Sequence, residues 1–219
     1  MCRVTTLFLL LLGLFSSFLP PPVGALERKV EPTLQRIREA AAGVETIAST
    51  MEQEKHLKVF AEILKARGHF VFQRPDCWRW ELTEPVLSGV SVCGGQGWRW
   101  HEKGGKAQSF KLADEPWLSH FATQITAWTT ADFDFLQKEY VLTLLDSQLN
   151  SDLNSERPSL KLVPREAAAR RLVASLEITF SADYRYVTRI IIREADGDYT
   201  AINFRDVIIN QPLPEDSFK

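Results

Sequence analysis

A run of short alternating segments, each ended by turn residues, constrains the fold of this chain more than any other feature of its sequence. Polar and apolar side chains alternate in segments at residues 69–74, 77–82, 86–93 and 98–100. Pro75, Thr83-Glu84-Pro85 and Gly94-Gly95 separate these segments. Alternation with a period of two between Gly- and Pro-rich turns predicts β-strands, and such short turns join antiparallel neighbours. The sequence therefore predicts an antiparallel meander across residues 69–100.

Further strands and a few helices are predicted on both sides of this meander. The remaining strand segments are residues 140–144, 160–163, 174–180, 186–194 and 199–209. Asp196-Gly197 is a tight-hairpin signal between the last two of them. Helical spacing and end signals predict helices at residues 32–42, 117–128 and 131–137, and a shorter one at 166–171. Residues 44–64 mix strand-like and helical patterns, and residues 146–158 form a polar loop.

These elements predict a mainly β (α+β) domain. A sheet with so few helices lacks a complete second layer, so it must curl to bury its apolar face. We therefore expect an incomplete antiparallel β-barrel, or half-barrel, closed by the N-terminal helix and a central helical lid. The apolar side chains of that lid are Trp117, Phe121, Ile125, Trp128 and Phe133.

The N-terminal 25 residues have the three parts of a secretory signal peptide. Arg3 supplies the charge, residues 7–19 are almost wholly apolar, and Val23-Gly24-Ala25 offers small side chains for cleavage. The alternative is an uncleaved anchor, but this apolar core is shorter than the ~20 residues that span a bilayer, and three prolines close it. We expect cleavage after residue 25, a single domain over residues 26–219, and a soluble periplasmic protein.

Composition and motifs argue against several classes of function. A formal net charge of −2 gives no electrostatic basis for binding nucleic acid. The sequence has no HExxH, GxSxG, P-loop or GxGxxG motif. Its histidines are scattered, at His56, His69, His101 and His120. We therefore expect no catalytic site, no cofactor and no metal site.

Cys77 and Cys93 are the only cysteines that remain once a signal peptide containing Cys2 is removed. If the strand that ends at Cys93 folds back over the turn at residues 83–85, the two cysteines lie opposite each other. That position suits a disulfide in an oxidising compartment. The alternative is two free buried thiols, because a register slip of one residue would separate the pair. We predict the disulfide.

The same strands carry an aromatic stripe that we interpret as the lining of a ligand cavity. Its members are Phe70, Phe72, Trp78 and Trp80, with Val90 and Val92 on the opposed strand and Trp98 and Trp100 on the next. The alternative is ordinary core, which is what most aromatic stripes form. Arg74 favours a cavity, because a charge on an apolar face needs a partner or access to water. We expect its guanidinium to reach carbonyls at a helix end, in the lid around residues 117–137.

The sequence resembles the outer-membrane lipoprotein carrier (LolA) family. The resemblance is most specific at residues 68–80, which read GHFVFQRPDCWRW, and at Pro85, Gly94 and Trp98. Met51-Glu52-Gln53-Glu54-Lys55 is similar to an FTQEK-like stretch of the family, and the closing Asn210-Gln211-Pro212-Leu213-Pro214 also agrees. The resemblance covers essentially the whole chain after the signal peptide.

This resemblance implies a periplasmic carrier with an incomplete barrel and a helical lid. Such a carrier takes acylated lipoproteins from an inner-membrane ABC exporter and delivers them to an outer-membrane acceptor. Arg74 matches the family's lid-latching arginine, and Trp78 stands where the family places a large cavity residue. We expect a monomer that shields acyl chains, since each buried methylene is worth about 0.8 kcal/mol.

Two departures from the family pattern leave the cargo open. Cys93 occupies a turn position where Asp-Gly is usual, and Trp78-Arg79-Trp80 is more aromatic than common members. Both features resemble a divergent LolA-like branch. The alternatives are therefore a carrier of another lipid or acylated metabolite, and a non-catalytic periplasmic sensory or interaction module.

Overall fold

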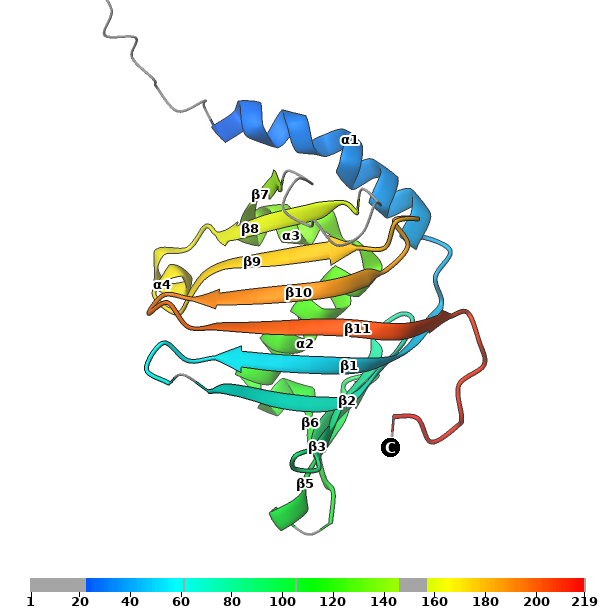
Figure 1. Ribbon diagram of the computed structural model, residues 1–219. Helices are drawn as coiled ribbons and strands as arrows, with labels where there is room; N and C mark the ends of the chain where they lie inside the picture. Colours follow the sequence, from blue (N-terminus) through cyan, green and yellow to red (C-terminus); the bar gives the residue numbers. More distant parts are fainter. Residues whose placement is uncertain (1–22, 61, 105, 146–156, 219) are drawn as a thin grey trace, which may run out of the picture.

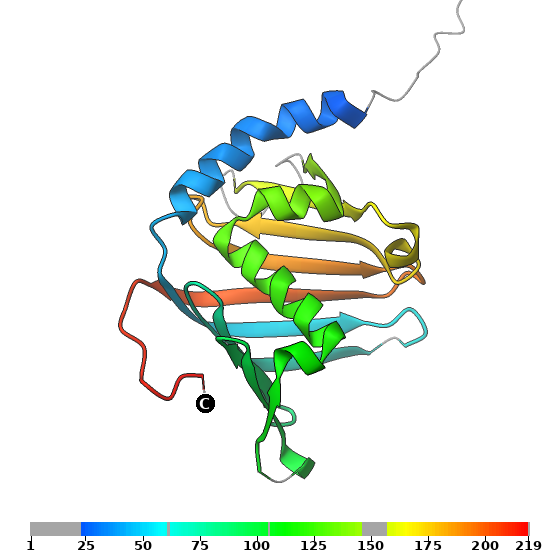
Figure 2. The ribbon, with the colours of Figure 1, turned by 180° about the vertical axis from the view of Figure 1, so that it is seen from behind.

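The computed structural model describes residues 23–60, 62–104, 106–145 and 157–218. Residues 1–22, with the predicted signal-peptide core, and most of the predicted loop at 146–158 lie outside the described residues. Within them, eleven antiparallel strands form one sheet that does not close, accompanied by four α-helices (Figures 1 and 2). The predicted mainly β half-barrel is confirmed.

The first and last strands of the chain lie side by side in the middle of the sheet, whose order is β6-β5-β4-β3-β2-β1-β11-β10-β9-β8-β7. One half consists of β1 (Thr46–His56), β2 (Ile63–Gln73), β3 (Cys77–Glu84), β4 (Ser88–Cys93), β5 (Gln96–His101) and β6 (Gln108–Lys111). The other half consists of β7 (Tyr140–Leu144), β8 (Ser159–Pro164), β9 (Val173–Phe180), β10 (Val187–Glu194) and β11 (Tyr199–Ile209). The meander predicted for residues 69–100 is β2 to β5.

The N-terminal helix α1 (Val23–Ala41) runs along the edge of the sheet that β7 and β8 form (Figure 1). It begins before Pro32, which the sequence placed in the first turn, so that start was wrong. Residues 26–31 are mostly good helix formers, and Val30 joins the core, so packing offsets the hydrogen bond that Pro32 cannot make. Val30, Leu34, Ile37 and Ala41 recur at helical spacing and are buried.

The central helices α2 (Pro116–Thr130) and α3 (Phe133–Glu139) cross one face of the curled sheet (Figure 2). Ala131 ends α2 with a left-handed φ of 56°, and Asp132 caps α3 by accepting a hydrogen bond from the backbone N–H of Phe135 at 3.0 Å. The short helix α4 (Ala167–Arg170) lies between β8 and β9. Two 3-10 turns, η1 (Glu102–Gly104) and η2 (Leu112–Asp114), flank β6. No helix among the described residues is both long and apolar enough to cross a membrane.

The predicted disulfide is confirmed. Cys77 and Cys93 are bonded, and their Cα atoms are 4.0 Å apart. Trp78 pairs with Val92 in the β3–β4 ladder, which places the two cysteines opposite each other at its end. The bridge therefore follows from the register that the turn at residues 83–85 sets.

Candidate functional site

The aromatic stripe forms one continuous surface on the side of the sheet that α2 covers. Phe72 pairs with Trp78, and Trp78 pairs with Val92. One step along, Phe70 pairs with Trp80, and Trp80 pairs with Val90. Directly paired residues of antiparallel strands point to the same face, so these side chains share the concave face of the sheet.

The two ends of this stripe differ in packing. Phe72 and Trp78 are fully buried, and the Trp78 ring meets the Phe121 ring of α2 edge-on at 6.0 Å. This part of the stripe is packed core. Phe70 and Trp80 instead contact Phe204 of β11, at ring-centroid distances of 5.5 and 6.0 Å. They border a pocket between the sheet and α2.

This pocket is apolar and nearly filled. It is lined by Ile47, Ser49, Phe70, Trp80, Ile125, Trp128, Thr129, Val187, Ile190, Phe204 and Val207. About 20 Å³ of it is open to the centre of a water molecule, roughly the room that one water needs. The structure therefore describes a closed conformation, in which the side chains of α2 occupy the interior of the half-barrel.

Trp98 and Trp100 do not belong to this interior, so their predicted place in it is wrong. Trp98 pairs with Ser91 and Trp100 with Gly89, and these residues alternate with Val90 and Val92 along β4. The indole of Trp100 packs on the outer face, under the guanidinium of Arg79 at 4.4 Å. The prediction extended the even-numbered face of β4 across the turn at Gly94-Gly95 by residue number. The register of β4 with β5 decides which residues share a face, and it places Trp98 and Trp100 on the outer face.

Most of the predicted lid residues face the sheet. Ile125 and Trp128 of α2 are buried and line the pocket, and Phe121 covers Trp78. Phe133, at the start of α3, is fully buried. Trp117 is the exception, because its side chain is 70% exposed at the start of α2.

Arg74 holds a helix end, but the helix is α1 and not the predicted lid. Its Nε donates to the carbonyl oxygen of Val44 at 2.7 Å, and its Nη2 donates to the carbonyl oxygen of Ala41 at 3.0 Å. Ala41 is the last residue of α1, where carbonyl groups lack partners in the helix and a cation interacts favourably with the helix dipole. Arg74 therefore fixes the connection from α1 to β1.

Asn210 holds the same connection from the other side, a role that the sequence analysis did not assign to it beyond its place in the closing stretch that resembles the family. Its side chain donates to the carbonyl oxygen of Gly43 at 2.8 Å and accepts from the backbone N–H of Glu45 at 2.7 Å. Its φ of 58° lies in the left-handed region, which Asn tolerates better than most residues. The one sign of this role in the sequence is an Asn directly after the long last strand, because Asn tolerates a left-handed backbone there.

Tyr140 and Gln124 form a neutral hydrogen-bonded pair beneath α2. The hydroxyl of Tyr140 donates to Oε1 of Gln124 in α2 at 3.0 Å. Burial, followed by the charge of Glu139, raises the pKa of Tyr140 to about 12, so the phenol stays neutral. The buried indole nitrogens of Trp78 and Trp128 have no hydrogen-bond acceptor among the described residues.

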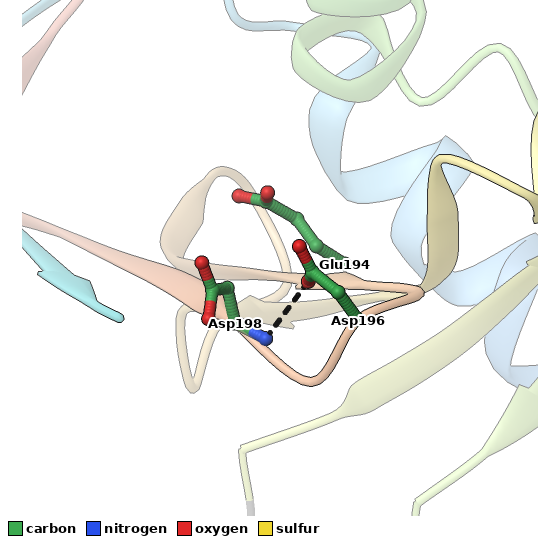
Figure 3. A group of neighbouring side chains, drawn as sticks. All are labelled: Glu194, Asp196 and Asp198. Atoms are coloured by element: carbon green, nitrogen blue, oxygen red, sulfur yellow. Dashed lines mark hydrogen bonds between the residues drawn. The ribbon is translucent and has the colours of Figure 1, made fainter. Parts of the chain in front are cut away.

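Three acidic side chains gather at the β10–β11 hairpin, and the sequence was interpreted there only as a tight turn (Figure 3). The carboxylates of Glu194, Asp196 and Asp198 lie within 4.8 Å of one another. Each has a protein partner: Glu194 pairs with Lys55 at 3.0 Å, Asp196 accepts from the N–H of Asp198, and Asp198 accepts from the N–H of Lys58 at 2.7 Å. The contacts of Glu194 and Asp198 tie the β1–β2 and β10–β11 hairpins together, and the contact of Asp196 lies within the β10–β11 turn.

The family model described as "Outer membrane lipoprotein carrier protein LolA" matches residues 42–219, which is every strand of the sheet and all of α2 and α3. The chain belongs to the LolA family. This agrees with the resemblance drawn from residues 68–80. Lipid or lipoprotein carrying is therefore the kind of function that the LolA fold suggests for the closed apolar interior. No curated protein sequence is similar enough to the chain to count as a match.

Several solved structures are similar to this LolA-family chain at low sequence identity. An uncharacterized conserved protein from Thermus thermophilus is 11% identical, with a TM-score of 0.50 over 87% of this chain and 97% of that one. A LolA-superfamily protein from Nitrosomonas europaea is 12% identical, with a TM-score of 0.43 and the same coverage. The Mycobacterium tuberculosis lipoprotein LppX is 10% identical, with a TM-score of 0.46 over 84% of this chain and 98% of that one. Of these, the similarity to the Thermus thermophilus protein supports the fold, and the fold alone.

Proposed function

We propose that this protein is a non-catalytic periplasmic carrier that shields the acyl chains of lipoproteins between its sheet and α2 and passes them from the inner to the outer membrane. An ABC exporter of the inner membrane would load it, and an outer-membrane acceptor would unload it. The carrier acts as a monomer. Membership of the LolA family supports this proposal.

The observation that carries the proposal is the apolar pocket beneath α2. Its lining is almost wholly hydrocarbon, with Ser49 and Thr129 as the polar exceptions among the residues that line it. Acyl chains are stabilised by such surface at about 0.8 kcal/mol per buried methylene.

The closed pocket requires α2 to act as the lid. An acyl chain is far larger than the space that remains, so cargo must displace the side chains of Ile125 and Trp128. Cargo then binds only to the fraction of molecules whose lid is open, which lowers its apparent affinity. This competition gives a carrier the moderate affinity that it needs to release cargo.

A charge placed in the pocket tests the proposal. Val207 of β11 lines the pocket and is half-buried, whereas its neighbour Ile208 lies on the outer face and is 54% exposed. We expect Val207→Glu to weaken binding of a fluorescent fatty-acid analogue at least about tenfold, because an acyl chain would have to desolvate the carboxylate. Ile208→Glu, the same change on the other face, should bind like the wild type.

Circular dichroism of both variants establishes that they are folded. Equal binding by the two variants would contradict an acyl site in this pocket. The same titration with a purified acylated lipoprotein, next to the free fatty acid, distinguishes lipoprotein cargo from another lipid.

A further inference from the structure

The apolar face of α2 continues beyond the pocket to an exposed tryptophan. Trp117, Phe121, Ile125 and Trp128 lie within about 80° of one another around the helix axis, at about 100° per residue. Ile125 and Trp128 line the pocket. The exposed fraction of the side chain is 70% at Trp117, but only 2% at Ile125 and 8% at Trp128. We call these four residues the α2 stripe.

Aromatic contacts join the exposed end of the α2 stripe to the interior. The Trp117 ring lies 6.4 Å from the Phe121 ring, which in turn lies 6.0 Å from the ring of the fully buried Trp78. Trp78 and Trp80 are two residues apart on β3 and share its inner face, and Trp80 lines the pocket. Apolar surface therefore extends from Trp117 to the pocket along both α2 and β3.

The first turn of α2, which carries Trp117, has no side-chain cap. Glu115 stands at the N-cap position, but its side chain makes no capping hydrogen bond and pairs with Arg99 of β5 at 3.1 Å. The start of α3, in contrast, is capped by Asp132. The first turn of α2 therefore loses no capping bond when it moves, and the ion pair neutralises the charge of Glu115 beside it.

The two ends of the α2 stripe differ in their access to water. Beyond Trp128, α2 ends at Ala131 and is followed by Phe133, and these residues are 2% and 0% exposed. At the other end, the indole of Trp117 lies in solvent. The polar end of an acyl chain must stay hydrated, so the chain lies with its methyl end toward Trp128. Tryptophan suits the opposite end, because its ring is apolar and its N–H can meet water.

The length of the α2 stripe decides which acyl chains reach Trp117. From Trp117 to Trp128 the helix rises about 16 Å, at about 1.5 Å per residue. An extended hydrocarbon chain advances about 1.25 Å per bond, from a C–C length of about 1.52 Å and near-tetrahedral angles. A chain of ten carbons therefore covers about 11 Å and ends near Phe121, whereas one of sixteen carbons covers about 19 Å and passes Trp117.

We propose that Trp117 contacts the part of a long acyl chain nearest its polar end, and that this contact makes the protein favour chains of about sixteen carbons over shorter ones. This inference rests on the proposed carrier function. It adds the chain length of the cargo and the residue that discriminates it.

Competition binding with two free fatty acids tests this inference. Decanoate and hexadecanoate, each below its micelle-forming concentration, displace a fluorescent fatty-acid analogue from the purified protein. We expect Trp117→Ser to weaken hexadecanoate binding about tenfold and decanoate binding less than about twofold, because only the longer chain buries the indole. Trp117→Phe keeps an apolar ring and should retain most of the affinity for hexadecanoate.

Leu172→Ser is the matched control, because Leu172 is 74% exposed and lies outside the α2 stripe, between α4 and β9. It should change neither affinity. Equal losses for both acids in Trp117→Ser would show that Trp117 supports the lid, and would overturn the inference. Wild-type protein that binds decanoate as tightly as hexadecanoate would also overturn it.

The same titrations separate this inference from the carrier function on which it rests. Wild-type protein that binds neither acid would contradict the carrier function itself. Wild-type protein that binds both acids, with hexadecanoate binding unchanged in Trp117→Ser, would contradict the role of Trp117 alone.

Discussion

The two ends of the central strands β1 and β11 differ in what their side chains contact. At one end, Arg74, Asn210 and the Cys77–Cys93 bridge hold the connection between α1 and β1 and the neighbouring β3–β4 ladder. At the other end, the turn between β1 and β2 exposes Val59 and Phe60 to solvent, and we call these two residues the rim. We call the first of these the clamped end.

This difference separates a part of the protein that maintains the fold from a part that does not. At the clamped end, backbone carbonyls receive charged or amide donors, and the loss of a donor leaves them unsatisfied. At the rim, apolar side chains make few contacts within the protein, so changing them costs the fold little. We infer that the clamped end keeps the half-barrel in shape while α2 moves.

The largest expected effect comes from removing the cation at the clamped end. Arg74→Leu removes both guanidinium hydrogen bonds, so the carbonyl of Val44 loses its side-chain donor while that of Ala41 keeps only the backbone N–H of Val44; hydrogen bonds to charged groups are worth about 1.5–3 kcal/mol each. We expect the free energy of unfolding to fall by about 4 kcal/mol in urea denaturation. The free energy of unfolding of Arg74→Lys should lie between those of Arg74→Leu and the wild type, since lysine keeps the charge but lacks the planar guanidinium group. A loss below about 1 kcal/mol would remove the distinction between the two ends.

At Asn210, the contribution of the side-chain hydrogen bonds to stability can be separated from that of the backbone conformation. Asn210→Ala loses both side-chain hydrogen bonds and puts a Cβ-bearing residue without a compensating amide at φ 58°, so we expect a loss of about 3 kcal/mol. Asn210→Gly loses the same bonds but accepts the backbone conformation, and should cost about 2 kcal/mol. Thermal unfolding of both variants gives the comparison. If Gly costs as much as Ala, backbone strain at this position is negligible.

The smallest effect is expected at the rim. Phe60→Ser removes a side chain that is 65% exposed, so the free energy of unfolding should change by no more than about 0.5 kcal/mol. The same urea titration used for Arg74→Leu measures it. A loss of about 2 kcal/mol or more would mean that Phe60 supports the fold, and the rim would no longer contrast with the clamped end.

Local signals made part of this fold predictable from sequence. In residues 69–93 each strand carries its own alternation and its own turn residues, and the Cys77–Cys93 bridge followed from the turn that joins them. β1 lacked such a signal, because its second half replaces apolar alternation with polar residues on both faces. Glu52 and Glu54 there form cross-strand ion pairs with Arg205 and Lys65. The second half of β1 is therefore stabilised as a strand by side chains of its neighbouring strands, and its own sequence shows no alternation of polar and apolar residues.

Parts of the candidate site depend on tertiary arrangement and could not be predicted. The sequence indicated that Arg74 bonds to carbonyls at a helix end, but only the packing of α1 against β1 decides which helix it is. Phe204 lines the pocket because β11 pairs with β1 across the whole length of the chain. Such pairing leaves no trace in the local pattern of either strand.

The central claim is that cargo displaces α2 while the clamped end stays closed. Hydrogen–deuterium exchange, with and without a bound acylated ligand, tests this claim most directly, since it reports the opening of each segment separately. We predict that loading changes the exchange of amides in residues 118–130 of α2, and that amides in residues 44–50, beside Arg74, keep their protection. Exchange that changes at residues 44–50 and not in α2 would contradict the account.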